Sequence, residues 1–218
     1  AESAATEVTT SKSQTRLTGL GTNGLVSETR STDIFGQTTV RTTVLDPDNK
    51  KRTVTTDAPT STTDAVAVYE NGLMTSRTTT SGLSYTTSYD ALERRTGQTD
   101  PRTGTSEIHY NASNQVDWME DAADNRTEFS YDASTGERVS VTDPEDNTVS
   151  TAYDTHGRTI AQWGATYPVY YEFDDFGQME KLHTLRSTAI TIDELSDITS
   201  NLASFDTTTW VYDEGTGL

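Results

Sequence analysis

The stretch Tyr153-Asp154-Thr155-His156-Gly157-Arg158 carries the phrase that organises this chain of 218 residues. An aromatic residue, here called the anchor aromatic, is followed by Asp and a short turn. The five anchors from Tyr89 to Phe173 are separated by 21, 21, 22 and 20 residues, and a last anchor follows 39 residues later. A fixed period of this length indicates stacked supersecondary units. The remaining anchor aromatics are Tyr110, Tyr131 and Tyr212.

A second phrase lies between the anchors, and its clearest copy is Asp143-Pro144-Glu145-Asp146-Asn147. Asp100 and Asp121 open two further copies, each ten residues before the next anchor Tyr. Asp caps a turn with its side chain, Pro presets φ, and Gly or Asn accepts a positive φ. Anchor turns and intermediate turns therefore alternate about every ten residues. About six residues remain between turns, which is the length of one strand.

The residues between the turns alternate as strands do. Positions two and four before an anchor share its face, and they are often aromatic or β-branched, as at Phe129 and Ile108. The opposite face carries polar residues such as Glu107 and Glu128. On the strands that leave the anchor turns, the same count places Trp118 on the aromatic face. The pattern predicts an all-β fold, an antiparallel meandering ribbon with one buried and one wetted face.

These phrases resemble the Rhs, or YD-repeat, family across about residues 30–218, with Tyr153 to Arg158 the closest copy. Glu93 and Asn114 depart from the pattern because Gly is usual there, and Phe173 replaces Tyr. The resemblance implies a ribbon curled as part of a shell or spiral. In bacterial Rhs proteins and the B and C components of Tc toxins, such a shell encloses a C-terminal toxin. In teneurins it is a cell-surface scaffold. The family's autoproteolytic aspartate has no matching position in this chain.

The repeat pattern is less regular in the N-terminal part of the chain. Residues 1–15 are rich in Thr, Ser, Ala and Glu, which predicts a poorly ordered or extended segment. Residues 16–218 are then a single YD-repeat ribbon and a fragment of a larger shell. The turn that starts at Asp33 matches an anchor turn with Thr32 in the aromatic position. Asp46-Pro47-Asp48-Asn49 matches an intermediate turn.

One segment breaks the strand pattern. Its apolar residues are spaced by 3, 3, 4 and 3 positions, which is typical of an amphipathic helix: Ile192, Leu195, Ile198, Leu202 and Phe205. Asp193 and Glu194 suit the first turn of such a helix because negative charge favours the helix dipole there. We expect one inserted helix near residues 191–205, which covers apolar surface or plugs the interior of the shell.

The composition narrows the choice of partners. The protein is acidic, with a formal net charge of −18, and only 31% of its residues are hydrophobic. Such a charge argues against nucleic acid and against an anionic membrane. No apolar run approaches the length of a membrane span, and the absence of cysteine excludes disulfides. The expected partners are the remaining repeats of the parent polypeptide, or copies of the chain joined through edge strands, and an enclosed polypeptide cargo.

The sequence offers no catalytic, cofactor-binding or metal-binding residue to assign. His109, His156 and His183 fall in separate units without metal-ligand spacing. Acidic turns leave Ca²⁺ open as an alternative, although carboxylates in turns usually form the turn itself: Asp121, Asp124, Asp143, Glu145 and Asp146. Sugar stacking is an alternative role for Trp118, Trp163 and Trp210, but their phase favours core packing.

The sequence therefore favours a non-enzymatic structural segment of a secreted or cell-surface bacterial protein, part of a β-shell around a toxin-like cargo. The alternative is a surface binding module or adhesin that recognises glycan or a partner protein. Such a module should carry aromatics off the buried stripe, and Tyr167 and Tyr170 are the candidates.

Overall fold

The computed structural model of the protein describes residues 11–21, 24–33, 35–187 and 189–212. The chain divides into two compact units, Ala1–Glu107 and Ile108–Leu218. Each unit is an antiparallel meander in which consecutive strands pair along the chain. The predicted all-β meander with one helix is confirmed.

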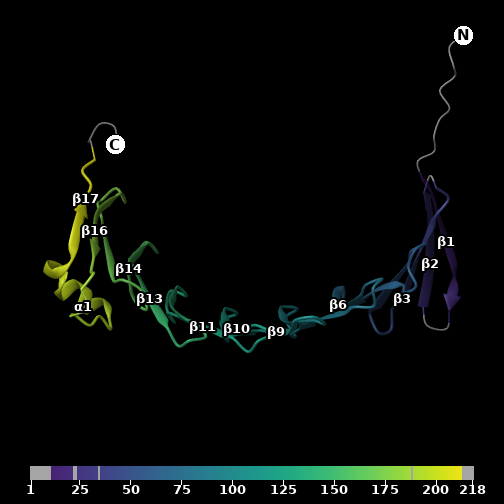
Figure 1. Ribbon diagram of the computed structural model, residues 1–218, viewed down its shortest axis with the longest axis horizontal. Coiled ribbons are helices and arrows are strands. Elements are labelled where there is room, and N and C mark those ends of the chain that lie inside the picture. Colours follow the sequence, from purple (N-terminus) through teal and green to yellow (C-terminus); the bar gives the residue numbers. More distant parts are fainter. Residues whose placement is uncertain (1–10, 22–23, 34, 188, 213–218) are drawn as a thin grey trace, which may run out of the picture. The chain divides into compact units, whose positions relative to one another are not determined.

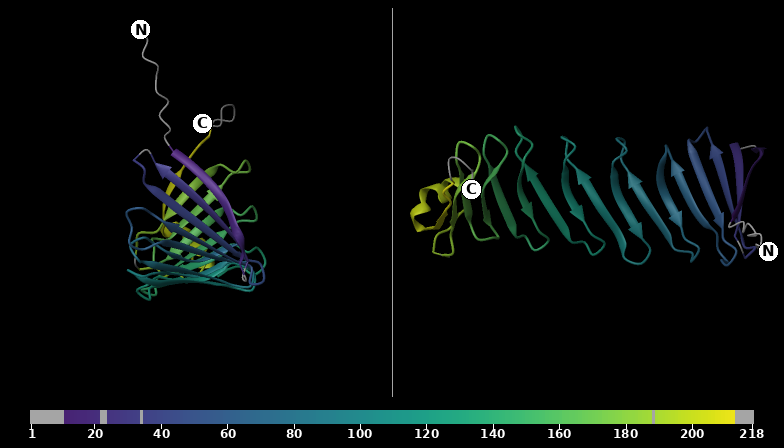
Figure 2. Two further views of the ribbon diagram at one scale, coloured as in Figure 1. Left: turned by 90° about the vertical axis from the view of Figure 1, so that its right-hand side faces the viewer. Right: turned by 90° about the horizontal axis from the view of Figure 1, so that it is seen from above.

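The strands of unit 1 lie side by side with turns at both edges of the sheet (Figures 1 and 2). Strand β9 begins in this unit and ends in the next. The strands are β1 (Ser11–Gly21), β2 (Gly24–Asp33), β3 (Thr38–Asp46), β4 (Lys51–Asp57), β5 (Ala65–Glu70), β6 (Leu73–Thr78), β7 (Ser84–Tyr89), β8 (Arg95–Asp100) and β9 (Gly104–Tyr110).

Unit 2 continues the same antiparallel pattern and adds short helices before its last strand (Figure 2). Its elements are β10 (Val116–Glu120), β11 (Arg126–Tyr131), β12 (Arg138–Thr142), β13 (Thr148–Tyr153), β14 (Thr159–Gly164), β15 (Val169–Phe173), β16 (Met179–Thr184), α1 (Leu195–Ser200), the 3₁₀ helix η1 (Leu202–Ser204) and β17 (Asp206–Thr209).

The division into residues 1–15 and 16–218 stays a prediction. Residues 1–10 lie outside the described part of the chain, and residues 11–15 belong to β1.

The inserted helix is confirmed but is shorter than the periodicity predicts. Glu194 still has extended backbone angles, φ −146° and ψ 168°, so α1 begins only at Leu195. The carboxylate of Asp197 accepts the backbone N–H groups of Asp193 and Glu194 at 2.9 and 3.0 Å, which fixes this start. Asn201 ends α1, and η1 follows as a separate turn. Ile192 and Phe205 are buried although neither is helical.

The largest buried cluster lies between this insertion and the sheet of unit 2. It contains Ala161, Leu185, Ile192, Ile198 and Phe205, with Trp163 and Tyr170 partly buried against it. Figure 1 shows α1 beside the sheet near β14 and β16. Ala161 pairs with Tyr170, which neighbours Tyr171 and so lies on the face opposite the anchor Phe173. The insertion therefore covers apolar residues of the face that does not carry the anchors.

Elsewhere the burial is shallower than a one-sided sheet predicts. The anchor aromatics Tyr89, Tyr131, Tyr153 and Phe173 are half-buried. Outside the cluster under α1, Val54 is the one buried hydrophobic side chain within the described residues. The strands are therefore held mainly by backbone pairing and by their turns.

The two kinds of turn share one hydrogen-bond pattern. In the anchor turn, the Asp154 N–H donates to the Arg158 carbonyl at 2.9 Å and the Gly157 N–H donates to the Asp154 carbonyl at 3.0 Å. In the intermediate turn, Asp143 makes the same two bonds with Asn147 and Asp146 at 3.0 and 3.1 Å. The fourth turn residue has a positive φ in both, 77° at Gly157 and 64° at Asp146.

This shared pattern explains two wrong assignments. Turns after odd-numbered strands lie at one edge of a meander and turns after even-numbered strands lie at the other. The anchor turn at Asp90 follows β7, whereas the turn at Asp33 follows β2 and belongs to the intermediate edge. The turn at Asp46 follows β3 and lies at the anchor edge. Because both kinds of turn use the same capping chemistry, the motif alone does not identify the edge.

A β-bulge follows each anchor turn whose pairing is described. The register shifts by one between Ser130 and Tyr131, and again between Ala152 and Tyr153. Intermediate turns lack this shift, since Thr142 pairs with Thr148 in step with Ser140 and Ser150. The extra residue moves the rest of the outgoing strand to the opposite face. The same shift occurs beside Tyr69, Tyr89 and Phe173.

On the outgoing strands, counting by two residues from the anchor therefore does not give the face on which a side chain lies. Trp118 pairs with Glu128, which lies next to Phe129 and faces away from the anchors. The prediction that Trp118 lies on the aromatic face is wrong for this reason. Tyr69 was missed as an anchor because a short Asn71-Gly72 turn follows it, yet it lies 20 residues before Tyr89 and carries the same bulge.

Glu93 occupies a position that glycine takes in the regular copies, with φ at 63°. A left-handed conformation costs a non-glycine residue about 1–2 kcal/mol. We expect Glu93→Gly to raise the free energy of unfolding by about 1 kcal/mol in chemical denaturation. Glu107→Gly, within β9, is the matched control and should lower it by about 0.5–1 kcal/mol. A destabilised Glu93→Gly protein would contradict the assigned strain.

Candidate functional site

The anchor tyrosines bind the backbone of the preceding repeat through their hydroxyl groups. The Tyr131 hydroxyl donates to the Val116 carbonyl at 2.8 Å, and the Tyr153 hydroxyl donates to the Arg138 carbonyl at 2.9 Å. Tyr89 donates to Met74 at 3.1 Å. The acceptor lies fifteen residues before the donor in all three cases. Each bond therefore joins one repeat to the one before it.

The acceptor has a defined place in the fold. Arg138 is the residue paired with Tyr131, so the Tyr153 hydroxyl bonds the strand directly opposite the previous anchor. Met74 pairs with Tyr69 and accepts from Tyr89 in the same way. Tyr212 donates to Met179, the partner of Phe173, at 2.8 Å. The phenol thus has a function beyond apolar contact, which explains why the repeat uses tyrosine.

Arginines pack against the aromatic rings of the sheet. The Arg158 guanidinium lies over the Phe173 ring at 4.4 Å, and Arg138 lies over Phe129 at 5.5 Å. Phe173 has no hydroxyl to donate, so the ring contact is the interaction that links this anchor to the previous turn. Such contacts contribute about 0.5–1 kcal/mol at exposed sites.

The opening carboxylates of the turns are fully engaged. Asp143 Oδ1 accepts the N–H groups of Glu145 and Asn147 at 2.9 Å, and its Oδ2 accepts the Asn147 side chain at 3.0 Å. In the anchor turn, Asp154 Oδ1 accepts two N–H groups and its Oδ2 accepts Arg158 Nε at 2.7 Å. The described residues hold no group of three or more candidate metal ligands. The acidic turns are thus organised around their own backbone.

These hydrogen bonds lower carboxyl pKa values. The Ser134 hydroxyl, followed by the N–H groups of Thr135 and Ser134, lowers the pKa of Asp132 to about 2. The Asn147 side chain and backbone lower the pKa of Asp143, although partial desolvation opposes the shift. A carboxylate that accepts several hydrogen bonds is stabilised in its charged form. Asn111 caps its own turn through Oδ1 without a charge.

The three histidines lie in different surroundings, as predicted. His156 is exposed at a turn tip, and His109 is exposed beside Asp117, with Nδ1 and Oδ2 at 3.1 Å. His183 is buried in a polar network that the sequence reasoning missed. Its Nε2 lies 2.8 Å from Glu172 Oε1 and its Nδ1 lies 2.9 Å from Thr207 Oγ1. Lys181 Nζ donates to the other oxygen of Glu172 at 2.7 Å.

This network joins the last three strands, β15 to β17. The Lys181 ammonium is the main cause of the lowered pKa of Glu172, with His183 a further contributor. Thr207, His183 and Glu172 form a hydrogen-bonded chain. The arrangement suits a structural clamp. Tyr170 and Glu172 are two positions apart and so share one face of the strand. This spacing was the sequence signal that could have indicated the network.

The tryptophans are not presented for stacking on sugar. Trp118 lies between strands β9 and β11, with His109 stacked on its ring at 5.3 Å and Arg126 over the ring at 4.0 Å. Its two neighbours come from opposite sides of β10, so both ring faces are occupied. Trp163 donates its indole N–H to the Asp193 carbonyl at 3.0 Å and packs against the core cluster. Trp210 is half-buried.

Of the two tyrosines off the aromatic stripe, Tyr170 packs against the buried cluster and contacts His183, with ring centroids 5.9 Å apart. Tyr167 is 72% exposed and is available for contact.

Shallow grooves lie between successive anchor turns. One groove, of about 590 Å³, lies between Asn111–Gln115 and Tyr131–Gly136. An equivalent groove of about 480 Å³ lies between Glu70–Asn71 and Tyr89–Glu93 in the other unit. Their recurrence follows from the repeat, so they are features of the scaffold. Within the described residues, no helix is long and apolar enough to span a membrane.

The chain matches no family model and no curated protein, but it is similar in fold to solved structures of Tc toxins. The crystal structure of TcdB2-TccC3 covers 88% of this chain at 14% identity and a TM-score of 0.47. The Tc holotoxin pore of Photorhabdus luminescens covers 85% at 16% identity and a TM-score of 0.47. This chain spans only 14% and 11% of the length of those two chains.

The hydroxyl bond of the anchor can be tested separately from its ring. We expect Tyr131→Phe to lower the free energy of unfolding by about 0.5–1.5 kcal/mol, because the Val116 carbonyl loses its donor. Tyr171→Phe is the matched control, since its half-buried hydroxyl makes no hydrogen bond to the described residues. It should leave stability within about 0.5 kcal/mol of the parent in urea denaturation. Equal effects of the two substitutions would refute the role of the hydroxyl.

The lowered pKa of Asp132 predicts acid sensitivity. Because its folded pKa, about 2, lies below the ordinary aspartate value of 3.8, its contribution to stability is present above pH 4 and is lost as the pH falls towards 2. Asp132→Asn keeps the capping oxygen but cannot titrate, so its stability should depend less on pH in this window. Denaturation midpoints between pH 2 and pH 6 test this. Parallel pH profiles for the two proteins would count against it.

Proposed function

We propose that the chain is a non-enzymatic structural segment of a bacterial YD-repeat protein. It forms part of a β-shell that encloses a C-terminal polypeptide cargo, in a protein that is secreted or held at the cell surface. The observation that carries the proposal is the repeated bond from each anchor tyrosine hydroxyl to the strand opposite the previous anchor. This bond fixes the position of each repeat relative to the one before it, as a sheet of many repeated strands requires.

The shallow burial supports the same role. A free-standing domain needs a substantial buried core, whereas these strands keep both faces partly exposed outside the cluster under α1. Side chains at turn tips are open as well, with Phe35 81%, Leu92 64% and Phe176 91% exposed. Further chain packed against these surfaces would remove apolar area from water.

The outer edge of β17 also supports pairing with a further strand. Strand β17 pairs with β16, and no second partner for it occurs among the described strands. An open edge exposes backbone N–H and C=O groups that pair readily with another strand. Further repeats of the same polypeptide are the partners that fit this edge, and copies of the chain are the alternative.

The proposal can be tested on the parent polypeptide. We expect its C-terminal region to resist protease while the repeats are folded, and to be cut once mild denaturant opens them. The same region expressed alone is the control and should be cut at once. Electron microscopy of the intact protein should show a closed particle. Equal cleavage of the region in the two settings would contradict the shell.

A binding module remains the second candidate, and exposed Tyr167 beside loop residues is the feature that favours it. Saturable binding of the isolated chain to a glycan array, lost on Tyr167→Ala, would establish that function in place of the shell.

A further inference from the structure

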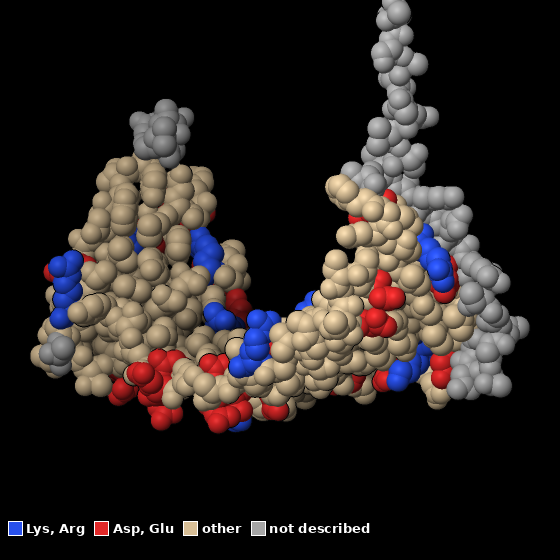
Figure 3. Space-filling view, turned by 45° about the vertical axis from the view of Figure 1, so that its right-hand side comes forward, with Lys and Arg blue, Asp and Glu red and all other residues tan. Residues whose placement is uncertain are grey.

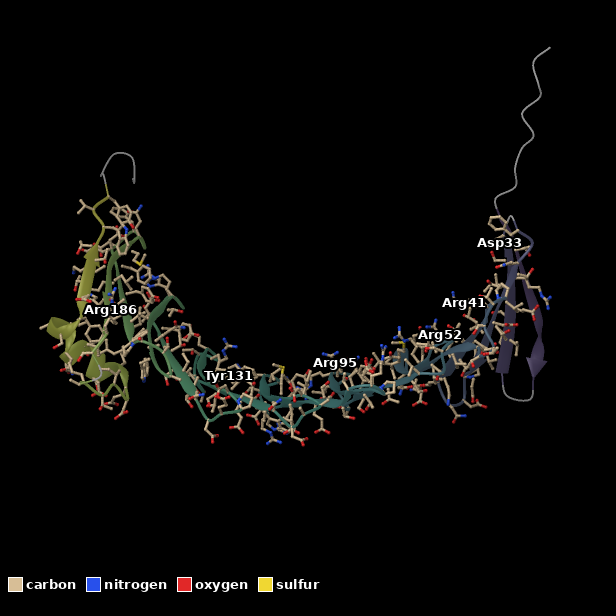
Figure 4. All side chains as sticks on the ribbon, in the orientation of Figure 1. Asp33, Arg41, Arg52, Arg95, Tyr131 and Arg186 are labelled. Carbon is tan, nitrogen blue, oxygen red and sulfur yellow. The ribbon has the colours of Figure 1, made fainter. Side chains whose placement is uncertain are left out.

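The anchor face of unit 1 is basic although the protein as a whole is acidic. Pairing places four arginines on the same face as Tyr69 and Tyr89. Arg52 pairs with Tyr69 and Arg95 pairs with Tyr89. Arg77 pairs with Tyr85, which lies four positions before the anchor Tyr89 and so shares its face. Arg41 pairs with Thr56, which lies four positions after Arg52 and so shares the face of Arg52. All four side chains are exposed. Arg41, Arg52 and Arg95 project to one side of the sheet in Figure 4.

Acidic side chains are missing from this face between the turns. From β2 to β8, the described strand positions that share the anchor face include no Asp or Glu other than Asp33 and Asp100, which open turns. Asp33 caps two backbone N–H groups at 2.9 Å, and Asp100 caps one at 2.9 Å. Figure 3 shows acidic and basic side chains over the surface of the protein.

The opposite face of the same strands differs. Arg30 pairs with Glu28 at 2.6 Å, and Lys51 lies 3.7 Å from Glu70, so cations of that face are neutralised locally. Among the described residues, no carboxylate forms an ion pair with Arg41, Arg52 or Arg77. Two of these guanidinium groups lie over aromatic rings, Arg52 over Tyr69 at 3.9 Å and Arg77 over Tyr85 at 4.8 Å.

A groove lies within this basic face. It has a volume of about 470 Å³, with Arg41 and Arg77 among its lining residues and Val54, Ala67 and Tyr69 supplying apolar surface. Val54 is only 6% exposed, so the groove reaches a buried position of this sheet. Arginines around apolar surface suit a ligand that carries both carboxylates and an apolar side chain.

We propose that this face binds an acidic polypeptide segment, with an apolar side chain in the groove and carboxylates on the surrounding arginines. Binding is a property of unit 1 itself and does not require that the chain belong to a shell. It therefore goes beyond the structural role proposed above.

The spacing of the arginines favours a polypeptide over other anions. Strand separation and register place the backbones of successive arginines roughly 12–16 Å apart, so a single phosphate or sulfate does not extend along the whole row. Single-stranded nucleic acid carries its charges more densely, and the net charge of −18 repels a long polyanion. A flexible acidic segment can place one carboxylate at each arginine and leave the rest of its length neutral.

The test uses the full chain and a fluorescent peptide that carries glutamates spaced by neutral residues and one central leucine. Anisotropy titration should show saturable binding that weakens with added salt. Arg41→Gln, Arg52→Gln and Arg77→Gln combined should weaken binding by at least about tenfold, since each exposed ion pair contributes up to about fivefold. Replacing the central leucine by glycine should also weaken it.

The control triple is Arg30→Gln, Lys50→Gln and Lys51→Gln, which removes the same charge from unit 1 without touching the anchor-face arginines. It should bind the peptide within about twofold of the parent chain, as surface substitutions away from a contact do. Circular dichroism should show that both triples keep the fold. Absence of binding, equal weakening by the two triples, or tighter binding of oligo-dT than of the peptide would each overturn the proposal.

Discussion

The fold depends on one interaction repeated along the chain, the capture of backbone N–H groups by the side-chain oxygen of the residue that opens a turn, an aspartate carboxylate in most turns and an amide at Asn111. In the turn at Asp154, one oxygen holds the N–H groups of His156 and Arg158, and the other holds the arginine side chain. A reversal without such a cap would leave these backbone N–H groups without an intramolecular partner at the edge of the sheet. The cap closes each reversal locally, so the sheet grows strand by strand without a large core.

Closing the turns does not by itself fix the relation between repeats. That relation comes from the bulge and the anchor hydroxyl together. The bulge beside Tyr131 sets the register of the next strand, and the Tyr153 hydroxyl then reaches the Arg138 carbonyl opposite Tyr131. Where the hydroxyl is absent, at Phe173, the guanidinium of Arg158 packs on the ring. Polar contacts at fixed positions therefore replace much of the packing that other folds use.

The same alternation separates the chemistry of the two faces. In unit 1, arginines follow the anchor tyrosines, while Glu28 and Glu70 lie opposite beside Arg30 and Lys51. In unit 2, the insertion that contains α1 covers the face away from the anchors, where Ala161 and Tyr170 provide an apolar floor. The chain thus has a basic surface in unit 1 and an apolar surface in unit 2, although its net charge of −18 predicts neither.

The sequence by itself determined the period, the all-β meander, the Asp-capped turns and the place of the helix. These are local properties: a capping Asp, a residue that accepts positive φ and alternation over six residues act within one hairpin. Only the tertiary structure decided which face Trp118 occupies, which edge holds the turns at Asp33 and Asp46, and that His183 meets Glu172 and Thr207. The reason is that one bulge residue reverses every later side chain of a strand, and a bulge is defined by pairing with a neighbour rather than by composition.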